Sequence, residues 1–242
     1  IVDSGLRLVE GSKESTYPIR CVEDASELGA QDYVIITLKA HMVGPVARGL
    51  ESLYHRDTAV VSAVNGIPWW YFYKSGGPYD GHRIASVDPD DAQWCFIGPE
   101  RVIGCVVDPS CEVTQPGVIT HIAGERFTLG EPSGERTERI TLLADAMKAA
   151  QLKAPVKTDI RNEIWIKLWG NLSFNPISVL TGATLDRICQ NDGTRAVVRE
   201  MMLEAQEIGD RATAICAGVA MLNADDVLLI AGKGHDCLLY TS

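Results

Sequence analysis

The sequence lacks the short motifs that would assign a function directly. It contains no Cys-x-x-Cys pair, no His-Glu-x-x-His, no Gly-x-Ser-x-Gly and no P-loop motif. The sequence therefore indicates no zinc ribbon, no metalloprotease site, no nucleophile elbow of an α/β-hydrolase and no P-loop nucleotide site. The Gly-x-Gly-x-x-Gly turn that seats a dinucleotide is missing as well. The five histidines show no spacing that suits metal ligands, and we predict no metal site.

An excess of positive charge and a long apolar run are also absent. The chain has 22 Lys and Arg against 32 Asp and Glu, a net charge of −10, whereas nucleic-acid binders usually carry a basic stripe. No apolar run approaches the roughly 20 residues that span a bilayer. The seven cysteines form an odd set without metal spacing, which is typical of reduced thiols. We therefore predict a soluble cytoplasmic protein without nucleic-acid or membrane partners.

What is present begins with the pattern of an α/β domain. The core of residues 32–39 is a continuous apolar run rich in β-branched side chains, which is typical of a strand buried on both faces of a parallel sheet. Residues 41–54 then show helical periodicity, and residues 58–64 form a second run of the buried-strand type. A strand, a helix and a second strand in this order predict a βαβ unit.

The surrounding residues extend this first half. We expect an irregular stretch over residues 67–100 and an amphipathic helix over 135–151. Strands are expected at residues 5–9 and 17–22, which flank a polar turn at 10–15, and at 101–108, 117–122 and 126–130. The last two of these are expected to form an antiparallel pair.

The second half is predicted to be helical. No convincing strand follows residue 160, while helices are expected over 159–176 and about 194–217. Pro176 should kink or end the first of these, because its ring clashes with the carbonyl of the residue four positions earlier. We therefore predict two domains, 1–157 and 158–242.

A polar stripe runs along the first of these helices. Lys167, Asn171 and Asn175 recur every four residues and so lie on nearly one helical face, within a segment that is otherwise apolar. An ammonium group and two carboxamides in a row can bind and protonate an oxygen-rich small molecule. A solvated polar face explains the same spacing equally well, so these residues alone leave both interpretations open.

Polar residues also follow two strands of the βαβ unit. Thr37, Leu38 and Lys39 end the first strand, and Asn65 follows the second. Ligands in open α/β sheets bind at the carboxyl ends of strands, although a loop lysine and an Asn-Gly turn are ordinary features on their own. The aromatic run at 69–73 could shield a pocket, but packing of a long loop is the favoured interpretation.

Taken together, these segments resemble the ketopantoate reductases. The similarity rests on residues 36–40, 64–66 and 161–167, followed by the two asparagines and Pro176 in the same order. It implies a Rossmann-type N-terminal domain that binds NADP and an all-helical C-terminal domain. It also implies hydride transfer from NADPH to a small 2-keto acid, namely the reduction of 2-dehydropantoate to R-pantoate for pantothenate and coenzyme A synthesis.

The resemblance also assigns roles to individual residues. Lys167 would be the general acid, whose ammonium stabilises the developing alkoxide and supplies the proton. The other roles are in binding: Asn65, Asn171 and Asn175 for the substrate, and Thr37, Leu38, Lys39 and Asn65 for the cofactor.

The sequence departs from the family at both ends. The first strand with its Gly-rich turn, and the basic residue that reads the 2′-phosphate, should precede Ile1, and a substrate-binding Ser and Glu have no counterpart near the C-terminus. We expect a fragment that is inactive by itself, with a non-native tail at 233–242. Two alternatives stay open: a reductase of another branched or aromatic 2-keto acid, and a non-catalytic nucleotide-binding module. A homodimer also stays open.

Overall fold

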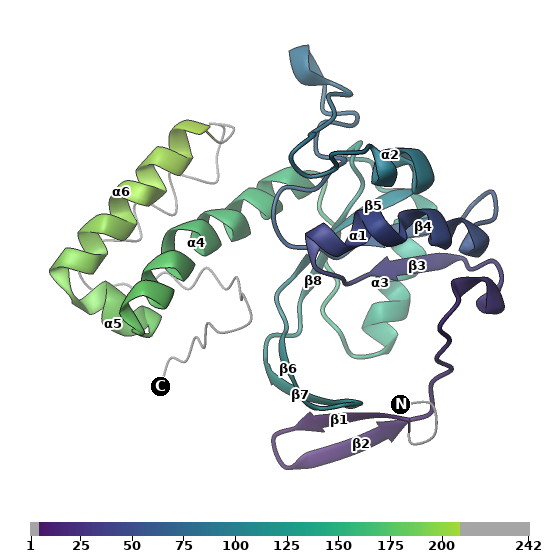
Figure 1. The fold of residues 1–242 in the computed structure, drawn as a ribbon, viewed down its shortest axis with the longest axis horizontal. Coiled ribbons are helices and arrows are strands. Elements are labelled where there is room, and N and C mark those ends of the chain that lie inside the picture. The colour runs from purple at the N-terminus through teal and green to yellow at the C-terminus, as the bar shows by residue number, and fades with distance from the viewer. Residues whose placement is uncertain (1–4, 209–242) are drawn as a thin grey trace. The chain divides into compact units, whose positions relative to one another are not determined.

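The computed structural model describes residues 5–208, which fall into two compact units. The first unit ends with Arg161 and the second begins with Asn162. Helix α4 (Ile160–Thr181) starts at the end of the first unit and continues into the second (Figure 1). The expected tail at 233–242 and the end of the last expected helix lie outside the described residues. Within residues 5–208, no helix is both long enough and apolar enough to cross a membrane.

The main sheet of the first unit has the strand order β3-β4-β5-β8. Strands β3 (Tyr33–Ile36), β4 (Ala59–Ser62) and β5 (Val102–Val107) are parallel, and β8 (Phe127–Gly130) pairs with β5 in the antiparallel sense. Helix α1 (Ala40–Ala47) connects β3 to β4, which confirms the predicted βαβ unit.

The predicted helix over 41–54 is not one α-helix. It changes after Ala47 into a 3₁₀-helix, Arg48–Leu53. Gly44, Pro45 and Gly49 fall in this stretch, and both residue types weaken an α-helix. The shorter helices of the first unit are α2 (Ala92–Phe96) and the 3₁₀ segments Ala25–Leu28, Gly77–Tyr79 and Pro99–Arg101.

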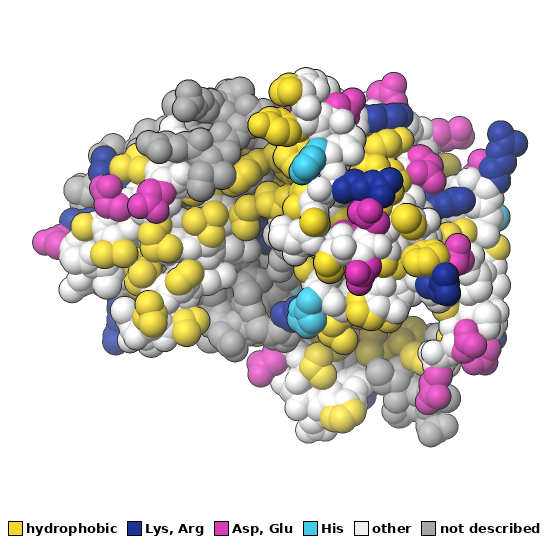
Figure 2. All heavy atoms as spheres, turned by 45° about the horizontal axis from the view of Figure 1, so that its top comes forward, with side chains coloured by type: hydrophobic (Ala, Val, Ile, Leu, Met, Phe, Trp, Pro, Cys, Tyr) yellow, Lys and Arg dark blue, Asp and Glu magenta, His cyan; other side chains and the backbone are white. Residues whose placement is uncertain are grey.

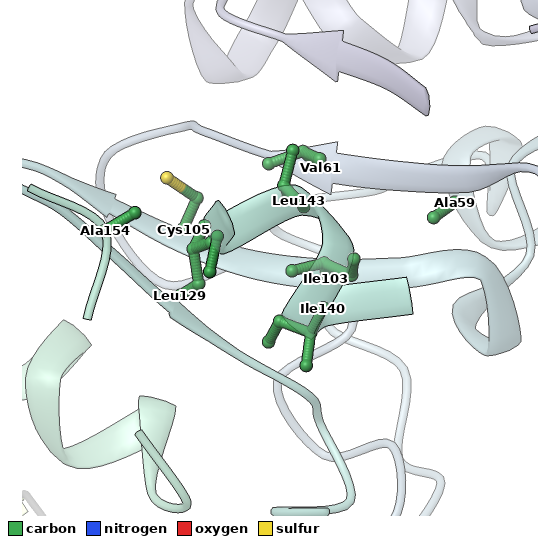
Figure 3. Close-up of a cluster of buried hydrophobic side chains, with 9 residues drawn as sticks. Ala59, Val61, Ile103, Cys105, Leu129, Ile140, Leu143 and Ala154 are labelled. Atoms are coloured by element: carbon green, nitrogen blue, oxygen red, sulfur yellow. The ribbon is translucent and has the colours of Figure 1, made fainter. Parts of the chain in front are cut away.

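The core of the first unit lies between the main sheet and helix α3 (Glu138–Ala149). Figure 3 shows side chains from β4, β5, β8 and α3 meeting there. All four residues of β4 are buried, so its apolar run reflects burial on both faces, as predicted. The same prediction is wrong for β3, because Ile35 is 55% exposed. Strand β3 is the edge of this sheet, and the core cluster reaches its Tyr33 without covering Ile35.

A second sheet of the first unit has the order β2-β1-β7-β6. Strand β1 (Leu6–Glu10) is antiparallel to β2 (Lys13–Tyr17) and parallel to β7 (Val118–Ala123), which is antiparallel to β6 (Ser110–Gln115). Two expectations are therefore wrong. The strand expected at 17–22 lies at 13–17, and the strands near 118 and 127 belong to different sheets rather than forming a pair.

The polar turn expected at 10–15 is shorter than predicted. Glu10 and Lys13 are directly paired, which leaves only Gly11 and Ser12 in the turn, and Gly11 has a φ of 60°. Two-residue hairpin turns require positive φ, which glycine adopts without strain. The polar residues after the turn pair in the strand because β2 is largely exposed and at a sheet edge.

The second unit is helical over its described residues, as predicted. It holds the rest of α4, helix α5 (Leu185–Gln190) and helix α6 (Asp192–Ile208). Their shared apolar cluster comprises Trp169, Phe174, Leu185, Ile188, Val198, Met202 and Ala205.

Pro176 does not end helix α4, which continues to Thr181. The clash expected from the proline ring costs roughly 3 kcal/mol inside a helix. Residues on both sides of the proline pack into the apolar cluster of the second unit, with Leu172 and Phe174 before it and Ile177 after it. This packing holds the last turn in place and offsets the lost hydrogen bond.

The described surface mixes charges of both signs. On the face drawn in Figure 2, Lys and Arg side chains lie among Asp and Glu side chains rather than in a separate stripe. Ion pairs such as Arg83 with Asp91 and Arg7 with Glu14 contribute to this pattern.

Candidate functional site

Two of the predicted segments lie at one edge of the main sheet. Residues 37–39 directly follow β3, and Asn65 lies three residues after β4. The two strands are parallel and in register, with Ile36 opposite Ser62, and the amide of Ala63 donates to the Ile36 carbonyl at 3.0 Å. The structure therefore brings these polar residues to the same carboxyl edge.

This edge is open to solvent and electrostatically suited to an anion. Residues 37–39 and Asn65 are all exposed. Helix α1 begins directly after its N-cap Lys39, and no side chain caps it there. The first amides of a helix carry partial positive charge and attract phosphate or carboxylate groups. Together with the Lys39 ammonium, they give the edge a positive character.

A small cavity lies beneath this edge, within the first unit. It has a volume of about 20 Å³, and its wall includes Ile36 and Ser62 from the strand ends, Val43 from α1, and Gln93 from α2. This space accommodates about one water molecule. The cavity is therefore too small to hold a nucleotide.

The aromatic run at 69–73 serves mainly in packing. Trp69 and Trp70 are 5% and 1% exposed, and Trp69 contacts Trp94 edge to face with ring centres 5.9 Å apart. The indole N–H of Trp70 is buried without a hydrogen-bond partner. Indoles held this deeply fix the loop that follows β4, and Trp69 also forms part of the wall of the small cavity described above.

The polar stripe of α4 is carried by the second unit. Lys167 is 8% exposed, and Asn171 and Asn175 are half-buried. Lys167 is therefore buried, unlike a residue of a solvated polar face. Buried lysines usually serve a partner or a reaction, because removing an ammonium group from water is costly.

Asn171 carries an unsatisfied acceptor. Its side-chain Oδ1 is buried and has no hydrogen-bond partner. A buried carbonyl oxygen without a donor costs about 1–3 kcal/mol, and such groups in a native structure call for an explanation such as an absent ligand. The stripe thus presents an acceptor that fits an incoming hydroxyl or N–H group.

The residues predicted to act together are distributed over both units: the strand-end residues in the first and the stripe in the second. Within residues 5–208, no group of three His, Cys, Asp or Glu side chains could hold a metal ion. Sequence reasoning gave no role to Arg161, whose guanidinium donates to three backbone carbonyls. No sequence signal could have shown this, since backbone carbonyls occur in every residue.

Comparisons with known proteins identify the family of this chain. The family model described as "Ketopantoate reductase PanE/ApbA" matches residues 1–69, and its C-terminal counterpart matches residues 159–231. A crystal structure from Ralstonia solanacearum MolK2, named as a ketopantoate reductase, is 39% identical with a TM-score of 0.83, covering 92% of this chain and 73% of that one. The chain belongs to the ketopantoate reductase family. This confirms the Rossmann-type and helical fold class that the sequence resemblance implied.

Two matches to curated proteins differ greatly in extent. The 2-dehydropantoate 2-reductase of Mesorhizobium japonicum is 58% identical over 207 residues, which are 86% of this chain and 64% of that protein. The chain therefore spans less than two thirds of this relative. A stretch of 42 residues is 55% identical to a UDP-N-acetylmuramoyl-L-alanyl-D-glutamate–2,6-diaminopimelate ligase of Chelativorans, but it covers only 9% of that ligase.

Proposed function

We propose that the protein carrying this chain reduces 2-dehydropantoate to R-pantoate with NADPH, in pantothenate and coenzyme A synthesis. The observation that carries the proposal is the buried Lys167 with the unsatisfied Asn171 oxygen one turn further along the same helix. Family membership supports the reaction class. A cation and an acceptor side by side match a substrate that has both a reactive carbonyl oxygen and a hydroxyl group.

The open edge of the main sheet fits the cofactor. Thr37, Leu38, Lys39 and Asn65 would hold it there, where the α1 N-terminus and the Lys39 ammonium favour its negative charge. When bound, NADPH supplies the hydride. We propose NADPH over NADH from the family resemblance, and isothermal titration of the full-length protein with both cofactors would test this preference.

The chain's own residues account for the proton and for orientation. The Lys167 ammonium donates a proton to the carbonyl oxygen of the substrate as that oxygen becomes an alkoxide. Asn171 accepts a hydrogen bond from the substrate hydroxyl, and Asn175, one turn beyond, binds a carboxylate oxygen. Burial of Lys167 strengthens its interaction with the developing negative charge.

A substrate panel tests the reaction. With the full-length gene product, we expect NADPH oxidation with 2-dehydropantoate at a kcat/KM roughly 100-fold or more above that for 3,3-dimethyl-2-oxobutanoate, which lacks only the hydroxyl group, since a site that binds a hydroxyl group rejects an analogue without it. A preference for phenylglyoxylate would instead support the aromatic 2-keto acid alternative. NADPH binding without reduction of any keto acid would support the nucleotide-binding module.

Substituting Asn171 separates binding from stability. Asn171→Leu removes an unsatisfied buried acceptor while keeping the side chain's branched shape, so we expect unchanged or higher thermal stability. The KM for 2-dehydropantoate should rise about tenfold, the equivalent of one lost hydrogen bond. Differential scanning calorimetry and initial rates measure the two effects.

Asn191→Leu is the matched control for this substitution. The Asn191 Oδ1 accepts a hydrogen bond from the amide of Thr194 at 3.1 Å, so its loss should lower stability and leave KM unchanged. A destabilised Asn171→Leu with wild-type KM would contradict a substrate role for Asn171.

Three further assignments accompany this function. We propose domains 1–157 and 158–242, since the amide of Lys157 still bonds to the Leu129 carbonyl of β8 at 2.8 Å. A cytoplasmic location follows from the proposed biosynthetic role. A homodimer is the proposed assembly, for which light scattering of the full-length protein is the direct measurement.

A further inference from the structure

Two glycines of the main sheet form a notch for the first residue of α4. Gly104 of β5 and Gly130 of β8 are directly paired. A Cβ atom added to Gly130 would lie 2.5 Å from the Cβ of Ile160, and one added to Gly104 would lie 2.9 Å from the Ile160 Cγ1 and 2.7 Å from the Trp70 ring. Ile160 is 1% exposed. The missing side chains therefore make the space that Ile160 fills.

The next residue, Arg161, forms hydrogen bonds to two loops of the first unit. Its Nε and Nη2 donate to the carbonyls of Tyr71 and Tyr73, each at 2.6 Å, and its Nη1 donates to the carbonyl of Pro132 at 2.7 Å. The guanidinium also lies 5.8 Å from the centre of the Tyr71 ring. Three charge-assisted hydrogen bonds from one rigid fork fix the direction of the side chain.

These contacts hold the beginning of a helix, which is where helices fray. The first turn of a helix lacks internal partners for its amides. Burial lowers the pKa of the Arg161 guanidinium, which means that burying this charge costs desolvation free energy. Lys167 follows Arg161 by six residues on the same helix, about 9 Å along its axis. The anchored turn and the lysine therefore belong to the same continuous helix.

We propose that Ile160 and Arg161 form an anchor that positions the Lys167 ammonium for proton transfer. The proposal rests on the proposed function, because it needs Lys167 to be the general acid. A displacement of about 1 Å at a reacting group can lower a rate roughly 100-fold. Arg161 is thus a positioning residue, which acts through the helix and touches no substrate.

The first unit offers a matched control. The Nη1 of Arg101 donates to the carbonyls of His55 at 2.9 Å, Thr58 at 3.3 Å and Arg56 at 3.4 Å, and the guanidinium lies 5.2 Å from the centre of the Tyr54 ring. The interactions are of the same kind as those of Arg161. They secure the loop before β4 and involve no residue of α4.

Kinetics of three full-length variants test the anchor. Arg161→Ala and Arg101→Ala should both lower the melting temperature, but only Arg161→Ala should lower kcat, by about 10- to 100-fold with the KM for NADPH within twofold of wild type. Arg161→Lys keeps the positive charge but cannot donate the three hydrogen bonds of the guanidinium in the same geometry, and it should recover part of kcat. Wild-type kcat in Arg161→Ala, or an equal kcat loss in Arg101→Ala, would overturn the proposal.

Hydrogen exchange gives a readout that does not depend on activity. In Arg161→Ala we expect faster exchange of the amides of residues 162–167 and unchanged exchange in α3, while Arg101→Ala leaves both unchanged. If the wild-type protein reduces no 2-keto acid, the proposed function fails, and the exchange measurement still decides whether Arg161 holds this turn. Unchanged exchange at 162–167 in Arg161→Ala overturns the anchor even in an active enzyme.

Discussion

Lys167→Ala is expected to lower kcat by roughly 100- to 10,000-fold in the full-length protein with 2-dehydropantoate and NADPH. General acid catalysis by a positioned side chain contributes about this much, and the buried ammonium also stabilises the negative charge that develops on the substrate oxygen. Cofactor binding should be unchanged, because the predicted cofactor residues lie on the main sheet. Steady-state NADPH oxidation and a fluorescence titration with NADPH measure the two quantities.

Two other substitutions make this result specific. Lys167→Arg retains the positive charge but replaces a proton donor with a group that does not deprotonate in proteins, so we expect substrate binding to survive and kcat to stay low. Lys148→Ala removes an exposed lysine of α3 that pairs with Asp145 at 3.1 Å, and kcat should not change. A loss of only a few-fold in Lys167→Ala would remove the general-acid assignment.

The parts of the fold that the sequence predicted are those where burial leaves a local pattern. Strand β4 is buried on both faces, so its continuous run of apolar residues predicted it correctly. Strand β6 has the sequence Ser-Cys-Glu-Val-Thr-Gln and is exposed along most of its length, so nothing in its composition marks a strand. The parallel pairing of β1 with β7 joins segments more than a hundred residues apart, and its register leaves no local signal.

The candidate site also contains residues that the sequence predicted and residues that it could not predict. Lys167 and Asn171 stood out because polar residues interrupt an apolar helix, and the structure finds one buried ammonium and one buried, unsatisfied oxygen there. The anchor at Ile160 and Arg161 could not be predicted. Arg161 bonds to backbone carbonyls, and Ile160 fills the space that two glycines leave free. These groups come together only after the sheet has formed.

A buried ion pair joins three elements of the first unit. Glu131, which follows β8, is 3% exposed, and Arg139 of α3 donates its Nε to one carboxylate oxygen at 2.8 Å and its Nη2 to the other at 2.6 Å. The hydroxyl of Thr137 donates to Glu131 at 2.6 Å. Arg139 also donates to the carbonyls of Glu100 at 3.0 Å and Val102 at 3.2 Å, at the start of β5.

Glu131→Ala is expected to lower the free energy of unfolding by about 3–5 kcal/mol, which is among the largest effects a single substitution produces. The carboxylate is the only acidic group bonded to Arg139 among the contacts described above, and its removal leaves the guanidinium partly buried without a counter-charge. The hydroxyl of Thr137 loses its acceptor as well. Urea denaturation followed by circular dichroism should show a lower midpoint with an unchanged m-value.

Two controls identify the cause of this loss. Asp145→Ala breaks the exposed pair with Lys148, and exposed pairs contribute only about 0–1 kcal/mol. The double substitution Glu131→Leu with Arg139→Met removes both charges and should recover part of the stability, since apolar replacement of a whole buried pair is often neutral or stabilising. If the double variant is less stable than Glu131→Ala, the hydrogen bonds of Arg139 to the carbonyls of Glu100 and Val102 at the start of β5 contribute more than its unpaired charge costs.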